Sequence, residues 1–436
     1  MAAITQNLIK LIIADQQNEQ IMPMQYYSRS TEKKLKALSE NKEIIVLTGI
    51  RRCGKSVLMH FIRNLSDHRD YYFNFEDERL VTFTSDDFQL LYEAFIELFG
   101  IQKIFYFDEI QNIPNWEMFV RRLYNAGNKI FITGSNATLF SDELGTRLTG
   151  RYMSLTIYPF SFLEYVLPTL PDIPQQKVLS TTMIGQIKKL FNEYCQIGGI
   201  PEYSKQHQVE YLHSLYESIL YRDIVSRYKL TNAEGIKKLV FYLASNCSKE
   251  TTYNALRKLL GIGSTTTVSD YCGYLENSYL CFFLNRYSPS LKSQQQSPKK
   301  VYFIDHALAK IIGFRVSEDR GRLLENIVFI ELKRRGHTFF YHRENKECDF
   351  IIQQNTKIVA AIQVCQELSD TNTREREISG LIEALETHSL STGYILTEGE
   401  EAEEVITKNN SQFHIRILPL WQWLLDWDDT FGELPS

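Results

Sequence analysis

The sequence predicts an α/β protein whose front part is a parallel sheet with helices on both faces. Three observations predict it. A glycine-rich motif lies between an apolar run and a segment of helical periodicity, further apolar runs alternate with helical patterns as far as about residue 160, and the connections are short. Residues 160–235 then have a mostly helical pattern, and residues 318–436 alternate again, which indicates a separate α/β domain.

The glycine-rich motif is Gly49-x-x-x-x-Gly54-Lys55-Ser56, the pattern of a phosphate loop. The apolar run Ile44–Leu47 predicts a buried strand before it, and Val57–Leu65 predicts a helix after it. The glycines let successive N–H groups face a triphosphate, Lys55 can reach the β- and γ-phosphates, and Ser56 can ligate Mg²⁺. A chance glycine-rich turn is the alternative. We expect the loop to bind ATP and Mg²⁺ through Gly49, Ile50, Arg51, Arg52, Cys53, Gly54, Lys55, Ser56 and Val57.

The second half of such a site is expected after two further elements, a strand at Asp70–Phe75 and a helix at Ser85–Phe99 that starts with Ser85-Asp86-Asp87. The run Lys103–Glu109 then predicts a strand that ends in two acids. Asp108 would hold Mg²⁺ through water, and Glu109 would polarise the attacking water. The alternative is a strand that happens to end in a polar turn.

A possible sensor of the γ-phosphate follows the helix predicted at Asn115–Ala126 and the strand predicted at Lys129–Thr133. That strand runs into Gly134-Ser135-Asn136, and a polar side chain there would lie beside the γ-phosphate. The same three residues also favour an ordinary turn. The pattern does not separate Ser135 from Asn136.

Two arginines, Arg147 and Arg151, precede a strand predicted at Met153–Tyr158. Either could reach the triphosphate of a neighbouring subunit as an arginine finger, or could be a surface charge or salt-bridge partner. An arginine finger supplied between subunits implies a homo-oligomer or a protein partner.

The middle of the chain carries a basic segment. Residues 236–300 contain nine Lys and Arg against three Asp and Glu, whereas residues 301–436 contain fourteen against twenty-three. Helices at 236–246, 252–260 and 264–280, with a turn at Gly261-Ile262-Gly263, predict a helix-turn-helix, and Lys292–Lys300 a wing or linker. Such a module can bind DNA or serve only for packing. Its third helix starts with Ser264 and three threonines, which suit phosphate contacts better than base reading.

The last part of the chain has the patterns of a helix, several strands and a closing apolar segment. The predicted elements are a helix at Arg322–Lys333, strands at Phe339–Tyr341, Asp349–Gln353 and Ile358–Val364, a helix at 373–388, a strand at Gly393–Thr397, and a core cap with Trp421, Trp423 and Trp427.

Composition narrows the class of protein. Hydrophobic residues make up 44% of the chain, which is typical of a globular protein. No apolar run approaches membrane-spanning length, and the N-terminus lacks the pattern of a signal peptide. Seven cysteines are scattered without a C-x-x-C pair, so we expect reduced thiols, no disulfide framework or zinc site, and a cytoplasmic protein.

Taken together, the motifs are similar to those of bacterial and archaeal AAA-type ATPases with a C-terminal domain of uncharacterised function and restriction-endonuclease-like fold. The blocks that carry this resemblance are GIRRCGKS (49–56), YFNFED (72–77), FYFDEIQN (105–112), TGSNA (133–137), TRLTGRY through YPFSFLEY (146–165), GGIPEY (198–203), VYFIDHAL (301–308), RLLENIVFIEL (322–332) and ECDFII (347–352). The resemblance implies an AAA-like P-loop core at 1–160, a helical lid at 161–235, a winged helix at 236–300 and a restriction-endonuclease-like domain, the PD-(D/E)xK fold, at 301–436.

The C-terminal region departs from the catalytic pattern of that nuclease fold. The pattern needs an acid on the first helix, an Asp at a strand end and Glu-x-Lys on the next strand. Glu325 and Asp349 match, but the third element is Gln363-Val364-Cys365, so a hard-metal ligand is weakened and the cation is missing. We therefore expect no nuclease activity and interpret Glu325, Asp349 and Gln363 as a relic site, with an allosteric contact surface as the alternative role of Glu325 and Asp349.

The expected function is Mg²⁺-dependent ATP hydrolysis that drives a conformational change, on DNA or on a protein partner. The alternatives are a slow nucleotide-gated switch and a DNA-binding regulator that acts through the winged helix. A metal-dependent nuclease is the least favoured alternative.

Overall fold

The computed structural model describes residues 4–18, 26–65, 69–137, 148, 150–173, 179–314 and 319–425. The chain divides into two compact units. Unit 1 comprises Met1–Tyr158 with Asn277–Tyr279, and unit 2 comprises Pro159–Glu276 with Leu280–Ser436. Each unit is described by itself.

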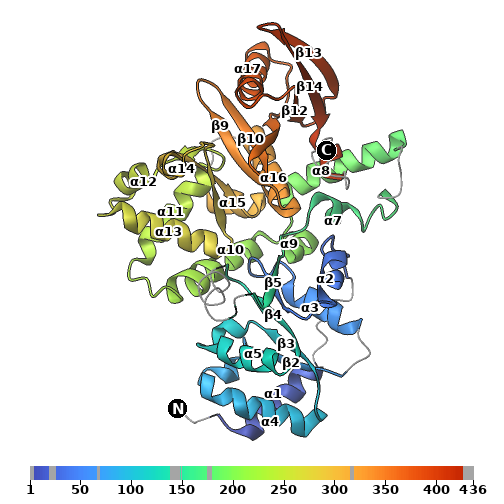
Figure 1. Cartoon of the computed structure of the whole chain (residues 1–436), viewed down its shortest axis with the longest axis vertical. Coiled ribbons are helices and arrows are strands. Elements are labelled where there is room, and N and C mark those ends of the chain that lie inside the picture. The colour runs from blue at the N-terminus through green and yellow to red at the C-terminus, as the bar shows by residue number, and fades with distance from the viewer. Residues whose placement is uncertain are drawn as a thin grey trace. The chain divides into compact units, whose positions relative to one another are not determined.

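Unit 1 contains a five-stranded parallel sheet in the order β2-β3-β4-β1-β5 (Figure 1). Its strands are β1 (Ile44–Thr48), β2 (Tyr71–Asn74), β3 (Ile104–Asp108), β4 (Lys129–Gly134) and β5 (Tyr152–Thr156). The predicted parallel sheet is confirmed, and each predicted strand end lies within two residues of the observed one. Because all five strands run the same way, the loops that follow them gather at one edge of the sheet.

The helices of unit 1 alternate with these strands. They are α1 (Gln6–Asn18), α2 (Glu32–Ser39), α3 (Lys55–Asn64), α4 (Phe88–Phe99) and α5 (Trp116–Asn125), with 3₁₀ turns η1 (Glu78–Leu80), η2 (Ser85–Asp87) and η3 (Ile110–Asn112). The predicted start of the fourth helix is corrected. Thr84 and Asp87 form a reciprocal capping box, so Ser85–Asp87 is a 3₁₀ turn and the α-helix begins at Phe88.

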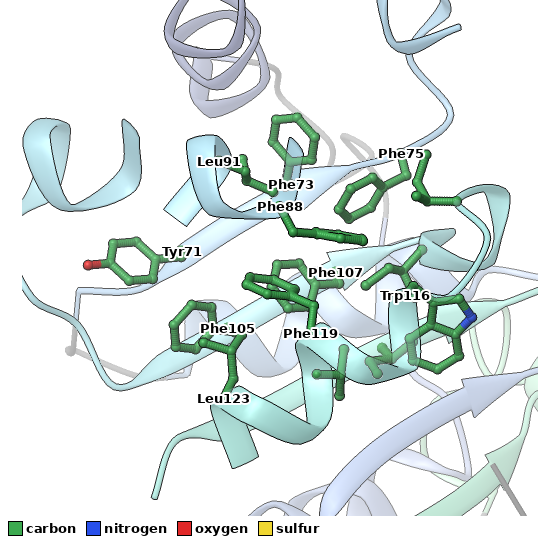
Figure 2. Close-up of a cluster of buried hydrophobic side chains, with 14 of the residues drawn as sticks. Tyr71, Phe73, Phe75, Phe88, Leu91, Phe105, Phe107, Trp116, Phe119 and Leu123 are labelled. Atoms are coloured by element: carbon green, nitrogen blue, oxygen red, sulfur yellow. The ribbon is translucent and has the colours of Figure 1, made fainter. Parts of the chain in front are cut away.

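Aromatic residues fill one face of this sheet. Strands β2 and β3 direct alternate side chains towards α4 and α5. These side chains, Tyr71, Phe73, Phe105 and Phe107, belong to the hydrophobic cluster in Figure 2. Phe88 stacks on Phe119 with ring centroids 4.5 Å apart. On the other face, Tyr72 lies against His60 of α3 at 4.6 Å. Helices therefore cover both faces, and each buried aromatic ring contributes roughly 1.5–3 kcal/mol to the free energy of folding.

The first part of unit 2 is mostly helical, as predicted for residues 160–235. Its elements are α7 (Phe162–Val166), α8 (Thr181–Ile197), α9 (Pro201–Gln206), α10 (Val209–Ser218), the π-helix η6 (Ile219–Ser226), α11 (Ala233–Ser245), α12 (Tyr253–Leu260), α13 (Thr265–Asn277), α14 (Leu291–Gln296) and α15 (His306–Ile312). The predicted helix-turn-helix corresponds to α11, α12 and α13.

A small antiparallel sheet that the sequence patterns did not reveal accompanies these helices. Its strands, in the order β6-β8-β7, are β6 (Glu250–Thr251), β7 (Cys281–Asn285) and β8 (Lys299–Phe303). The short helix α14 lies between β7 and β8, inside the segment expected to be a wing or linker. The third helix ends at Asn277, three residues before its predicted end, and Tyr279 has a left-handed backbone with φ 59°.

The C-terminal part of unit 2 is built on a six-stranded mixed sheet in the order β13-β14-β12-β11-β10-β9. Its elements are α16 (Arg320–Arg335), β9 (Thr338–Arg343), β10 (Glu347–Gln354), β11 (Lys357–Val364), α17 (Thr371–His388), β12 (Thr392–Thr397), β13 (Ala402–Lys408), β14 (Ser411–Pro419) and α18 (Leu420–Leu425). The expected α/β alternation is confirmed, but β13 and β14 were not predicted. Trp421 and Trp423 are buried in α18, and Trp427 lies outside the described residues.

Two expectations about the chain's environment can be compared with these residues. All seven cysteines are buried, and none of them forms a disulfide within the described part of the chain. Among the described helices, none combines the length and the apolar character that crossing a membrane requires.

Candidate active site

The loop between β1 and α3 has a backbone shape that two of its glycines make possible. Gly49 has φ 141°, and a Cβ atom there would lie 2.1 Å from the carbonyl oxygen of Ile157. Gly54, which precedes α3, has φ 99°. Other residues rarely adopt these angles, so any side chain at either position would strain the loop. The loop thus ends at the amino terminus of α3, where the helix dipole favours an anion.

Lys55 is the first residue of α3 and is buried, with 4% of its surface exposed. Its Nζ donates hydrogen bonds to the carbonyl oxygens of Gly49 at 3.2 Å and Ile50 at 3.0 Å. The same atom lies 3.7 Å from Oε1 of Glu109. The ammonium group is therefore inside the loop, where it contacts these two neutral acceptors and lies near the Glu109 carboxylate.

Asp108 ends β3 beside the phosphate loop and is almost fully buried. Its carboxylate accepts hydrogen bonds from the hydroxyls of Thr133, on the neighbouring strand β4, and of Ser56. Burial raises the pKa of Asp108 to about 6, and the charge of Glu109 adds to the rise, while these hydrogen bonds oppose it. The structure thus brings Ser56 and Asp108, the two predicted Mg²⁺ positions, into direct contact.

Glu109 follows at the sheet edge in a left-handed conformation, with φ 51°. Its backbone N–H donates to Oγ1 of Thr133 at 3.0 Å, and its carboxylate accepts from the Gln111 side chain. A left-handed non-glycine residue is uncommon and costs of order 1 kcal/mol or more, and such residues concentrate at functional sites. These contacts hold the carboxylate towards Lys55.

The two sensor candidates follow β4 at the same sheet edge, because Gly134 pairs with Thr48 at the end of β1. Ser135 and Asn136 are each 1% exposed. Within the described part of the chain, the Ser135 hydroxyl has no hydrogen-bond partner. Asn136 has a polar or electrostatic partner.

The remaining predicted loop residues differ in exposure. Ile50 and Cys53 are buried, and burial raises the pKa of the Cys53 thiol. Arg51 is paired with Glu76 at 2.6 Å, and Arg52 is exposed with φ 61°. Val57, in the first turn of α3, is half-buried.

Of the two arginine-finger candidates, Arg151 is described by the structure and is not brought to this site. Arg147 lies outside the described residues. Arg151 precedes β5 and its carbonyl oxygen accepts from the N–H of Ile44, the first residue of β1. It therefore lies at the amino-terminal edge of the parallel sheet, whereas the phosphate loop follows the carboxyl-terminal edge.

Two residues at the site have no signal in the sequence motifs. Arg29 donates to the carbonyl oxygens of Cys53 at 3.0 Å and Tyr158 at 2.6 Å, so it ties the phosphate loop to the end of β5. Tyr279 is 8% exposed and hydrogen-bonds with the hydroxyls of Thr48 and Thr156, which are 3.1 Å apart. Both are distant in sequence from the motif, and neither belongs to a recognisable pattern.

The segment that carries Tyr279 also meets the sensor strand. The carbonyl oxygen of Asn277 accepts from the N–H of Ala137 at 2.8 Å. The stretch Asn277–Tyr279 thus belongs to unit 1, although the residues before and after it belong to unit 2.

The three residues interpreted as a relic site, Glu325, Asp349 and Gln363, lie together in unit 2. They line one cavity of about 800 Å³. Cys365 supplies no cation, as expected, but the ammonium group of Lys300 on β8 bonds to both Glu325 and Asp349.

Comparison with known proteins divides the chain into three matched segments. Residues 41–166 match the AAA domain, residues 188–318 match a domain of unknown function (DUF8612), and residues 320–423 match a second domain of unknown function (DUF4143). The chain is 35% identical over 399 residues to the uncharacterised protein MJ1544 of Methanocaldococcus jannaschii, covering 88% of each chain. It is 31% identical over 367 residues to an uncharacterised protein of Haemophilus influenzae, covering 80% of this chain and 89% of that one.

Among solved structures, the chain is similar to a Walker-type ATPase of Pyrococcus abyssi. The sequence identity is 15% and the TM-score is 0.46, with 67% of this chain and 97% of that chain covered.

Proposed function

The chain belongs to the same protein family as MJ1544 of Methanocaldococcus jannaschii and carries an AAA-family P-loop domain, and we propose that this domain binds ATP with Mg²⁺ and hydrolyses it. The observation that carries the proposal is the meeting of two separate motifs at one sheet edge. Ser56 hydrogen-bonds with Asp108, and Lys55 lies 3.7 Å from Glu109. A glycine-rich turn that arose by chance would not be expected to lie beside the buried acidic pair Asp108 and Glu109.

In this proposal each residue has one role in phosphoryl transfer. Lys55 leaves its two carbonyl partners to bind the β- and γ-phosphates, and Ser56 and Asp108 hold Mg²⁺, Asp108 through water. Glu109 orients the attacking water. The Glu109 carboxylate lies 3.7 Å from the Lys55 ammonium, so it would lie near a γ-phosphate bound by that lysine. Positioning and charge neutralisation supply the catalysis, as in other phosphoryl transfers.

We assign the γ-phosphate sensor to Ser135 in preference to Asn136. A buried hydroxyl without a partner is costly, and a phosphate oxygen would satisfy it. Asn136 already has a partner. Ser135→Ala should therefore slow hydrolysis at saturating ATP more than Asn136→Ala does.

The test of the main proposal is Glu109→Gln. This variant should bind ATP with unchanged affinity and hydrolyse it at least about 100-fold more slowly, because the base is lost while the phosphate contacts remain. Phosphate release measures hydrolysis, and a fluorescent ATP analogue measures binding. Glu78→Gln, an exposed acid of η1, is the matched control and should behave as the unmodified chain. Normal turnover by Glu109→Gln would refute the assignment.

Turnover also separates an energy-coupled ATPase from the alternative of a slow switch. Single-turnover rates slower than one per minute that DNA does not stimulate would favour the switch. A rate per molecule that rises with protein concentration would support an arginine finger supplied by a neighbour. Arg151 could act only in that way, because it lies at the far edge of its own sheet.

The layout of unit 2 supports the proposed helical lid at 161–235, winged helix at 236–300 and restriction-endonuclease-like domain at 301–436. The order α11-β6-α12-α13-β7-β8 with an antiparallel three-stranded sheet is that of a winged helix. The segment from α16 to β12 supports the restriction-endonuclease-like fold. It runs from a helix through three antiparallel strands and a second helix to a parallel strand.

DNA binding through the winged helix is the second candidate function. The residues Ser264–Thr266 at the start of α13 are exposed, as is Lys258 at the end of α12, and these groups suit phosphate contacts. Lys300, however, is 2% exposed and cannot contribute to such a surface. DNA affinity should fall as salt rises, and an affinity that salt does not change would exclude this surface.

A further inference from the structure

Thr133 is a polar residue near the end of β4, and none of its surface is exposed. The sequence motifs assign it no role, because a β-branched residue at the end of a buried strand needs no special explanation. A hydroxyl group that water cannot reach must find its hydrogen-bond partners inside the protein. The partners of Thr133 therefore indicate what this side chain does.

The Thr133 hydroxyl bonds to two different residues, once as donor and once as acceptor. It donates to Oδ1 of Asp108, and it accepts from the backbone N–H of Glu109 at 3.0 Å. A hydroxyl group has a single hydrogen to donate, so the two bonds together fix its orientation. The proposed function gives these acids separate tasks, since Asp108 holds Mg²⁺ and Glu109 orients the attacking water. One side chain from the neighbouring strand thus contacts both.

Strand pairing places this hydroxyl beside the acids. Strands β3 and β4 are parallel neighbours, and Phe107 pairs with Ile132, so Asp108 and Thr133 are the next residues along their strands. Threonine branches at Cβ, and a β-branched side chain has few accessible rotamers. The register of the sheet and the stiff side chain together direct the hydroxyl to the end of β3.

The bond from Thr133 limits how the Asp108 carboxylate can turn. Asp108 is buried and also hydrogen-bonds with Ser56, the other residue proposed to hold Mg²⁺. On the other side of β3, the hydroxyl of Tyr72 lies 3.4 Å from Oδ2 of Asp108, which is longer than an ordinary O–H···O bond. Of these two strand hydroxyls, that of Thr133 therefore fixes the carboxylate.

The bond to Glu109 supports an uncommon backbone conformation. Glu109 has φ 51°, in the left-handed region that costs free energy for a residue other than glycine. Thr133 accepts from the N–H of this residue, and the Glu109 carboxylate lies 3.7 Å from Nζ of Lys55. Without the hydroxyl, the turn after β3 would lose this tie to β4, and the direction of the Glu109 carboxylate would no longer be fixed.

We propose that Thr133 is a positioning residue for ATP hydrolysis, an inference that rests on the proposed function. Its hydroxyl orients Asp108 for the Mg²⁺ shared with Ser56 and orients Glu109 for the attacking water. Metal binding and water activation thus depend on one side chain, which acts through the two acids and not on the nucleotide. Residues that orient metal ligands by hydrogen bonds typically contribute about 10–100-fold to metal affinity or activity.

The test measures Mg²⁺ dependence as well as turnover. Binding of a fluorescent ATP analogue to the full chain is titrated with Mg²⁺ from metal-free buffer, and phosphate release is measured at saturating ATP and Mg²⁺. Thr133→Val keeps the shape of the side chain and removes the hydroxyl. It should leave the metal-free affinity unchanged, raise the Mg²⁺ concentration for half of the gain in affinity at least about tenfold, and slow hydrolysis by about 10–100-fold.

Two further variants separate positioning from a structural role. Thr133→Ser restores the hydroxyl on a freer side chain, and both properties should return to within about threefold of the unmodified chain. Thr397→Val is the matched control, because Thr397 is equally buried at the end of β12 and its hydroxyl also donates and accepts, with the backbone of Glu400. It should lower the urea midpoint as Thr133→Val does, and leave Mg²⁺ dependence and hydrolysis unchanged.

If Thr133→Val does not fold, Thr133→Ala removes the hydroxyl without adding a methyl group and should show the same two losses. The inference is overturned by a folded variant without the hydroxyl that keeps the Mg²⁺ dependence and the rate of the unmodified chain. It is equally overturned if Thr133→Ser recovers neither property. An unmodified chain that binds no nucleotide would refute the proposed function, and this inference with it.

Discussion

The two units each bury one lysine beside carboxylates, but they do so in different ways. Lys55 in unit 1 donates to two neutral carbonyl oxygens and lies 3.7 Å from one carboxylate. Lys300 in unit 2 lies within 2.7–2.9 Å of three carboxylates. Both side chains are at most 4% exposed.

The difference separates a ligand-exchange site from an ion cluster that also holds the fold. Two neutral acceptors are easily replaced by phosphate oxygens, because a charge-assisted hydrogen bond is stronger than a neutral one. Two of the three carboxylates around the Lys300 ammonium, those of Glu325 and Asp349, are buried and depend on it, since without it they would lose their cationic partner in the interior. The lysine of unit 1 should therefore matter for nucleotide binding, and the lysine of unit 2 for stability.

The largest expected effect follows directly from this contrast. Lys300→Ala should lower the free energy of unfolding by about 3–5 kcal/mol, because it leaves buried carboxylates unpaired. Lys55→Ala should change it by no more than about 1 kcal/mol while abolishing ATP binding. Urea titration followed by circular dichroism measures the first quantity, and Lys103→Ala, an exposed lysine of unit 1, is the control. Equal losses of stability would remove the distinction.

The next prediction concerns His60, a buried histidine, and the loss of stability in acid. Burial lowers the pKa of His60 to about 4, against an ordinary value of 6.5. Between these values the unfolded chain binds the proton and the folded chain does not, so stability rises with pH in this window and is lost as pH falls. The loss attributable to His60 approaches about 3 kcal/mol at pH 4.

The variant His60→Phe should flatten that part of the pH dependence, and thermal unfolding between pH 4 and 7 checks it. Because Phe keeps the ring against Tyr72, packing is largely preserved. His213→Phe, at an exposed position of α10, should leave the slope unchanged. An identical slope in His60→Phe would show that other groups dominate acid unfolding.

A smaller effect is expected at Tyr279, which links the ends of β1 and β5. Tyr279→Phe removes its hydrogen bonds to Thr48 and Thr156 and should cost about 1 kcal/mol of stability. If the segment 277–279 positions the phosphate loop, hydrolysis should also slow several-fold with ATP affinity nearly unchanged. Steady-state kinetics separate the two, and Tyr221→Phe, at an exposed tyrosine, serves as reference.

The smallest effect concerns Arg51, which is paired with the partly exposed Glu76. Glu76→Gln should change the free energy of unfolding by less than about 1 kcal/mol, because exposed ion pairs contribute little. It removes the negative charge beside Arg51, and ATP affinity should rise two- to threefold at low salt and by less at high salt. A fall in affinity would mean that Glu76 supports the loop.

The sequence by itself determined the features that are local. The phosphate-loop motif, the strands at Ile44–Thr48 and Ile104–Asp108 and the helical stretch after residue 160 follow from periodicity, glycine conformation and short-range composition. The parallel direction of the strands in the first sheet also follows, because alternating strands and helices with short connections leave few other arrangements.

Only the tertiary structure decided which distant residues meet. Arg29 and Tyr279 reach the phosphate loop from segments with no motif, and Lys300 enters a carboxylate cluster from outside its domain. Strands β13 and β14 were equally hidden. Strand β13 lies at the edge of its sheet and is largely exposed, which leaves a weak apolar pattern in its sequence. The physical reason is that hydrogen bonds and ion pairs act over a few ångströms in space, whatever the separation along the chain.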